Sequence, residues 1–274
     1  MKYDALTVIL IAIIPLILTL IFILPQDIKE SYFVLNLSSP TLETIFLSNY
    51  THLEFDHFFY NLLAYIITIL VILAIETDRK MLFIMSILLF FVVPFISSIA
   101  TIIRLHSGIS KGFSAIAAGF LGYLLYASYK YAKINLNVNT SINFLFLIFI
   151  LIAVIFGFSN SYIFLGFLFM IPALFLIYFE RKGIVDLGNK IRLRLEDYKK
   201  QGILKLSMAL FVFIWVINSL FLFNELLIYK VENGTEINVI VHYLGYCFGL
   251  FMPLIWDVSV NKIPDIYRKI SKKF

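Results

Sequence analysis

Long apolar runs separated by short polar segments make up most of this chain. A helix needs about 20 apolar residues to cross the hydrocarbon core of a bilayer. Runs of roughly this length predict eight membrane-spanning helices, at residues 5–24, 57–75, 81–103, 112–131, 142–157, 161–179, 204–224 and 237–256. The stretch 142–179 is divided into two spans because Gly157, Ser159 and Asn160 interrupt it with turn-forming residues. The first run is longer than a signal-peptide core, so we expect it to be retained.

The composition supports a membrane protein. Of the 274 residues, 61% are hydrophobic and 14% are charged, whereas about a quarter of the residues of a soluble protein are charged. A water-soluble globule and a disordered chain are therefore excluded, and the single cysteine, Cys247, excludes a disulfide scaffold. The predicted fold class is all-α: a polytopic membrane helical bundle that forms a single domain over residues 1–274.

The basic residues predict how the spans are oriented. With eight spans and a cytoplasmic N-terminus, 18 of the 22 Lys and Arg residues lie on the inside, as cytoplasmic segments prefer. Residues 26–56 then form an outer loop, residues 180–203 a basic cytoplasmic loop and residues 257–274 a basic cytoplasmic tail. The prediction is a multi-pass protein of the cell membrane with both termini in the cytoplasm. Since topology accounts for the basic residues, no nucleic-acid partner is expected.

Apart from tyrosines and the cysteine, the titratable groups in the interiors of the predicted spans are two histidines, His57 and His242, each near the outer end of its helix. The span interiors contain no Asp, Glu or Arg, which argues against a proton-coupled transporter or an ion pump. His57 and Asn61, four residues apart, share one helix face. His242 lies about one turn into another helix. Taken singly, each of these residues is better explained by ordinary packing between helices.

Small residues indicate which helices approach one another. Gly245 and Gly249 lie on the face that carries His242, and glycines four apart let a second helix come close. The helix that begins after Gly112 carries a stripe of small residues, namely Ser114, Ala118 and Gly122. If the two faces pack together, Ser114 and His242 meet at the same depth. A serine beside a neutral imidazole is a nucleophile with its general base.

With these residues, the chain resembles the rhomboid family of intramembrane serine proteases. Three motifs carry the resemblance, in the family's order: HxxxN at His57 and Asn61, GxS at Gly112 and Ser114, and HxxGxxxG at His242, Gly245 and Gly249. His52 and Glu76, before and at the end of the HxxxN helix, are also similar. The resemblance covers residues 57–126 and 237–252 well. Elsewhere it extends only to hydrophobic helices.

The resemblance implies a serine endopeptidase that hydrolyses peptide bonds of membrane-protein substrates near the outer membrane face. Ser114 would be the nucleophile and His242 its base, while His57, Asn61 and the Ser114 amide would hold the oxyanion. Gly112, Ala118, Gly245 and Gly249 would pack the helices at the site. The implied partners are the lipid bilayer and single-span or polytopic substrate proteins. No cofactor is implied, and the spacing of the four histidines suggests no metal site.

Some features depart from the family pattern and keep alternatives open. The usual GxSG is GFSA here, with Ala115 in the last position, and Ala118 replaces a common aromatic residue. Residues 25–56 contain neither Trp nor Arg. The family core has six helices, so the eight predicted spans require an extra helical hairpin. The alternatives are a catalytically inactive rhomboid-like scaffold and, from another class, a transporter or channel.

Overall fold

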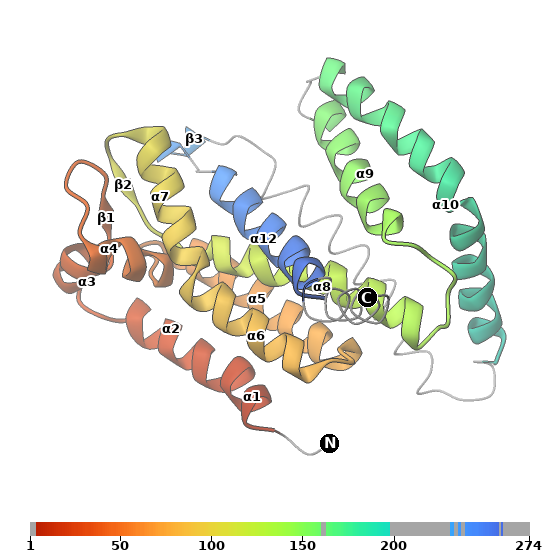
Figure 1. Cartoon of the computed structure of the whole chain (residues 1–274). Helices are drawn as coiled ribbons and strands as arrows, with labels where there is room; N and C mark the ends of the chain where they lie inside the picture. The colour runs from red at the N-terminus through yellow and green to blue at the C-terminus, as the bar shows by residue number, and fades with distance from the viewer. Residues whose placement is uncertain are drawn as a thin grey trace, which may run out of the picture. The chain divides into compact units, whose positions relative to one another are not determined.

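The computed structural model describes residues 4–159, 163–197, 231–232, 235–236, 239–257 and 259. These residues are almost wholly helical (Figure 1). Among them, five helices are long and apolar enough to cross a membrane: Ala5–Phe22, Phe55–Ile75, Arg79–Leu105, Ile163–Leu193 and Ile240–Asp257. The chain is therefore a helical membrane protein, as predicted. The number of eight spans stays a prediction, and the predicted span 204–224 lies outside the described residues.

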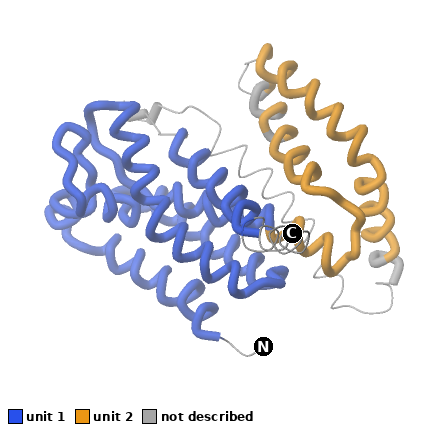
Figure 2. The backbone as a smooth tube through the Cα atoms, viewed as in Figure 1, with its two compact units in different colours: residues 1–126, 240–274 blue, residues 127–239 orange. Residues whose placement is uncertain are grey.

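The residues form two units, each packed mainly within itself (Figure 2). Unit 1 consists of residues 1–126 and 240–274, and unit 2 of residues 127–239. Helix α8 (Ser114–Ile134) begins in unit 1, and its last turns belong to unit 2. The prediction that the whole chain is one domain is not tested by this division. All the residues of the predicted site that the three motifs supply lie in unit 1.

Unit 1 is a bundle of apolar helices. The first span is continuous through α1 (Ala5–Val8), a π-helical turn η1 (Ile9–Ile13) and α2 (Ile14–Phe22). The other long helices are α5 (Phe55–Ile75), α6 (Arg79–Phe91), α7 (Val93–Leu105), the first part of α8, and α12 (Val239–Asp257). Their buried faces meet in an aromatic core in which the Tyr65 ring lies edge-on to Phe113 and Phe120.

The predicted span 81–103 is broken near its middle, between α6 and α7. Pro94 lies in the first turn of α7. A proline has no N–H, and its ring clashes with the carbonyl group four residues earlier, so a helix cannot continue regularly through it. That carbonyl belongs to Phe90, and here it accepts a hydrogen bond from the Tyr50 hydroxyl. The break therefore provides an acceptor for a residue of the preceding loop.

Residues 26–56, predicted as an outer loop, contain short elements: α3 (Gln26–Tyr32), β1 (Leu35–Asn36), α4 (Leu42–Leu47) and the 3₁₀ turn η2 (Ser48–Tyr50). Buried Asn49, in η2, connects these elements to α7 by hydrogen bonds. Its amide nitrogen donates to the Ser98 hydroxyl (2.9 Å) and to the Pro94 carbonyl (3.3 Å), and its amide oxygen accepts from Ser97 (2.7 Å). The loop is therefore held by side-chain hydrogen bonds as well as by apolar contacts.

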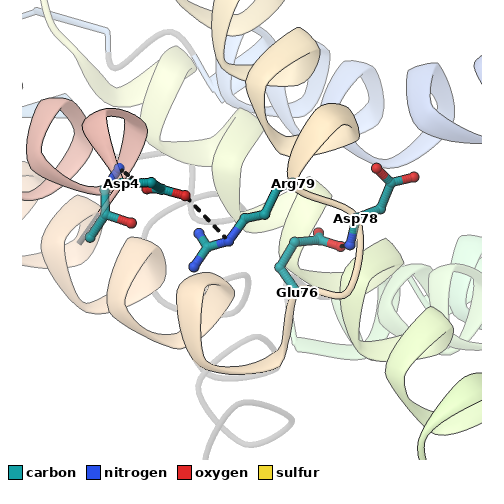
Figure 3. Close-up of polar contacts among 5 residues, drawn as sticks. Asp4, Glu76, Asp78 and Arg79 are labelled. Atoms are coloured by element: carbon teal, nitrogen blue, oxygen red, sulfur yellow. Dashed lines mark hydrogen bonds and ion pairs between the residues drawn. The ribbon is translucent and has the colours of Figure 1, made fainter. Parts of the chain in front are cut away.

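β1 also pairs antiparallel with β2 (Ile109–Ser110), so the loop is joined to the segment that leads into α8. At the turn between α5 and α6, Arg79 lies 3.8 Å from the Asp4 carboxylate at the start of α1 (Figure 3). Glu76 accepts the Asp78 N–H at 2.7 Å in the same turn. The Arg79–Asp4 pair is about half exposed, and exposed ion pairs contribute little to stability.

Unit 2 contains a helical hairpin in which α9 (Asn143–Ser159) and α10 (Ile163–Asp197) lie side by side (Figure 1). The predicted division of residues 142–179 into two helices is confirmed. Helix α10 continues through residues 180–197, within the cytoplasmic loop that the sequence predicts to be helical in part. Leu187 and Ile191 pack there against a small apolar cluster formed by Ala132, Leu136 and Val138. This contact gives the segment the apolar face that a stable helix needs. A short hairpin of β3 (Val231–Glu232) and β4 (Thr235–Glu236) precedes α12.

Candidate active site

Ser114 and His242 lie within hydrogen-bonding distance although 128 residues separate them in the chain. Ser114 is the first residue of α8, and His242 lies in the first turn of α12. The Ser114 Oγ is 2.7 Å from the His242 Nε2. Ser114 is half-buried and His242 is 7% exposed. The juxtaposition expected from the sequence is therefore present.

Glycines allow this approach because they let the backbones of α8 and α12 touch. A Cβ placed on Gly245 would lie 2.0 Å from the Ala115 carbonyl oxygen, and one on Gly249 would lie 1.8 Å from that of Gly119. A Cβ on Gly122 would lie 2.1 Å from the Tyr246 carbonyl oxygen. No side chain larger than hydrogen fits at these three positions without moving a helix.

The contact on α8 is made by Gly122 of the predicted stripe and by two residues beside the stripe. Ala115 and Gly119, the residues that flank the stripe, face Gly245 and Gly249. Ala118 is buried, at 5% exposed, but the closest backbone contacts fall on its neighbours. Ala115 replaces the glycine usual in the family motif, and its carbonyl oxygen is the atom nearest to Gly245. The alanine at this position is therefore compatible with close packing.

The segment that leads into Ser114 is held in place by its backbone. Gly112 has a φ of +132°, a region that L side chains rarely adopt, and its N–H donates to the Ser48 carbonyl (2.9 Å). The Phe113 N–H donates to the His52 Nε2 at 3.3 Å. The Phe113 ring is 1% exposed and packs against Tyr65. Conformation, hydrogen bonds and a buried ring together fix where α8 begins.

His52 is the functional candidate to which sequence reasoning assigned no role. It is 2% exposed. Burial, and then the neighbouring charges of His57 and Lys111, hold its pKa well below the usual range. His52 is therefore neutral, and its Nε2 is an acceptor, so the ring proton is on Nδ1. The position of His52, five residues before His57, was the available signal in the sequence. Its hydrogen-bond partner could not be read from the sequence, because the Phe113 amide lies 61 residues further along the chain.

His57 and Asn61 lie in the first turns of α5, next to this segment. A Cβ placed on Gly112 would lie 3.9 Å from the His57 Cε1 and 3.8 Å from the Ser114 Oγ. His57 is therefore beside the residue that precedes the site. Asn61 is 9% exposed, and its amide nitrogen donates to the His57 carbonyl oxygen at 2.9 Å. A direct contact between Asn61 and an oxyanion at Ser114 stays a prediction.

Tyrosine–carboxylate hydrogen bonds connect the same helices at the ends far from Ser114. The Tyr123 hydroxyl donates to Glu76, where α5 ends, and the Tyr126 hydroxyl donates to Asp257, where α12 ends. Helix α8 is thus joined to both helices that carry the histidines of the site. The available signal in the sequence was a pair of tyrosines three apart on one helix and a carboxylate at the end of each neighbouring helix.

Within residues 4–159, 163–197 and 239–257, no group of three or more His, Cys, Asp or Glu side chains could hold a metal ion. Comparisons with protein families, curated proteins and solved structures found no match to this chain. A function for this chain is therefore inferred from the motifs and from the geometry of the described residues.

Proposed function

We propose that this chain is a rhomboid-type intramembrane serine protease, a hydrolase that cleaves membrane-protein substrates with a Ser114–His242 dyad. The observation that carries the proposal is the 2.7 Å separation between Oγ and Nε2. A hydroxyl at this distance from a neutral imidazole can give up its proton as it attacks a carbonyl carbon. The glycine spacing and the direction of the two helices independently predict that these residues meet.

In the proposed reaction, Ser114 Oγ attacks the scissile carbonyl carbon and His242 takes the hydroxyl proton. His242 then gives this proton to the leaving amine, and an acyl-enzyme on Ser114 remains. A water molecule, deprotonated by His242, releases the acyl group and restores the serine. These steps need only the two side chains and water, so the reaction is balanced without a cofactor.

The negative charge that develops on the carbonyl oxygen would be stabilised at the start of α8. The first N–H groups of a helix have no acceptor within the helix, and the helix dipole favours an anion there. Ser114 is the first residue of α8, so its N–H is available to the oxyanion. The His57 imidazole beside Gly112 and the Asn61 amide would add donors, as the resemblance implies.

The site is expected to face the outer side of the membrane. This orientation depends on the distribution of basic residues, with the termini in the cytoplasm. Hydrolysis needs water, and the outer third of a bilayer is more accessible to water than its centre. Substrates would then be single-span or polytopic proteins that present an unwound peptide bond near that surface.

The test is cleavage of a single-span test protein by the purified full-length chain in detergent. We expect Ser114→Ala and His242→Ala each to abolish cleavage while thermal unfolding remains cooperative. Ser107→Ala and His106→Asn are matched controls, because both residues are exposed near the same end of the bundle. Labelling by a fluorophosphonate should be lost in Ser114→Ala and kept in Ser107→Ala. Normal cleavage by either dyad variant would refute the proposal.

A further inference from the structure

One face of α10 changes from apolar to cationic within a single turn. Large apolar side chains are exposed along this helix up to Phe179, and they include Phe175 and Tyr178 at 64% and 61%. Arg181 and Lys182 follow directly and are also exposed. Beyond the two cations, Ile184, Val185 and Leu193 are exposed as well. Glu180 does not interrupt the change, because it is buried and accepts a hydrogen bond from Ser141. An exposed apolar stretch is thus followed directly by two adjacent positive charges.

The described part of unit 2 contains two tyrosine–cation pairs. The Arg181 guanidinium lies 4.7 Å from the centre of the Tyr178 ring. Near the end of α8, the Lys133 Nζ lies 5.7 Å from the Tyr129 ring centre and 3.5 Å from its hydroxyl oxygen. Tyrosines are enriched where hydrocarbon meets the headgroups, and long cationic side chains extend from there toward the phosphates. Tyr129 is buried, at 7% exposed, so the exposed interfacial arrangement is that of Tyr178 and Arg181.

Arg181 and Lys182 also border a shallow, open hollow, which is lined further by Val185, Asp186 and Asn189. The one acidic group, Asp186, accepts the Asn139 N–H at 2.9 Å, so part of its carboxylate is engaged by the neighbouring loop. At 1.5 Å per residue, Lys182 lies about 5 Å beyond Phe179. This distance is within the headgroup layer of a bilayer.

We propose that this face of α10 binds an anionic phospholipid. Arg181 and Lys182 would hold the headgroup phosphate, and the acyl chains would lie along the exposed apolar surface that includes Phe175 and Tyr178. An anionic lipid is favoured over a zwitterionic one because the exposed groups next to the apolar surface are two full positive charges. The inference uses only residues of unit 2, so it does not depend on the proposed protease activity.

The test measures lipid retention by the full-length protein in detergent. Native mass spectrometry, with phosphatidylglycerol and phosphatidylcholine added in equal amounts, should show preferential retention of phosphatidylglycerol by the wild type. Each cation near a membrane surface strengthens the binding of anionic lipid. Loss of two cations should therefore lower the preference for phosphatidylglycerol over phosphatidylcholine about 30-fold. The variant is Arg181→Gln with Lys182→Gln. Its matched control is Arg79→Gln with Lys80→Gln, which removes the same charge from the α5–α6 turn of unit 1 and should keep the preference.

Three results would overturn the inference. They are equal retention of both lipids by the wild type, equal loss in the two double variants, and displacement of phosphatidylglycerol by inorganic phosphate at the same concentration. The last result would indicate a site for free anions and not for lipid. Because both cations are exposed, the charge-conserving variant Arg181→Lys with Lys182→Arg should fold and retain the lipid. Its failure to retain lipid while folded would also contradict the proposal.

Discussion

Replacing Gly245 by alanine tests how closely α8 and α12 must approach. The new Cβ would lie 2.0 Å from the Ala115 carbonyl oxygen, whereas ordinary contact begins near 3.4 Å. Both partners are backbone atoms of helices, so neither can rotate away as a side chain could. The helices must therefore separate by about 1.4 Å at this point. Overpacking of this kind costs about 1–3 kcal/mol.

The separation acts directly on the proposed dyad. His242 is three residues from Gly245, less than one turn away on α12. An added distance of about 1.4 Å would take the Ser114–His242 separation from 2.7 Å to beyond hydrogen-bonding range. A misplacement of about 1 Å at a reacting group can cost about 100-fold in rate. We therefore expect cleavage by Gly245→Ala to fall by about 100-fold and its unfolding temperature to decrease.

The assay pairs cleavage of a single-span substrate in detergent with thermal unfolding of the same sample. Gly188→Ala is the matched control, because Gly188 lies inside α10 and a Cβ there would meet nothing within 4 Å. It should cleave at the wild-type rate and be at least as stable, since alanine favours helix more than glycine does. Wild-type cleavage by Gly245→Ala would refute the claim that glycine contact sets the dyad distance. If Gly245→Ala lowers the unfolding temperature but the wild type itself cleaves no substrate, the close helix contact is supported and only the proposed protease function is refuted.

Three further predictions concern the residues around the dyad. Asn61→Ala should slow cleavage by up to about 10²–10³-fold if its amide holds the oxyanion, which single-turnover rates would show. The pKa of His52 is lowered in the folded chain, so near pH 6.5 only the unfolded chain binds the extra proton. The free energy of unfolding should therefore fall as the pH drops through that value, by up to about 1.4 kcal/mol per pH unit. The unfolding temperature of His52→Gln should lack this part of the pH dependence. Tyr126→Phe and Asp257→Asn should each reduce stability by about 1–3 kcal/mol, and a double variant no worse than either single one would show that the two side chains act as a pair.

Much of the helical framework follows from apolar run length alone. The positions of α5, α8 and α12 agree with the predicted spans to within a few residues. The pairing of Ser114 with His242 could also be predicted, because helix direction and glycine spacing place two side chains without knowledge of their contacts. Apolar run length and glycine spacing involve residues that are close together in the chain, so both can be read directly from the sequence.

The missed features all depend on partners that are distant in the chain. Pro94 signals a break in a helix, but nothing near it indicates that Tyr50 binds the freed carbonyl of Phe90. The hydrogen bond between His52 and Phe113 likewise needs two segments 61 residues apart. A partly helical segment after residue 180 could be expected, but its apolar contacts with Ala132, Leu136 and Val138 could not be read from the sequence. Such pairings are set by tertiary packing, which a single sequence does not reveal.

The contacts around α8 explain why the dyad can be formed before any substrate arrives. At its first turn, Phe113 and its preceding glycine are fixed by backbone hydrogen bonds, and at its middle the helix touches α12 through glycines. Further along, Tyr123 and Tyr126 join α8 to the ends of α5 and α12. A nucleophile and a base on helices held at several points need no rearrangement to meet. Control of the proposed reaction would therefore act on the approach of substrate and water, and variants that loosen α8 should lower the rate of the chemical step more than substrate binding.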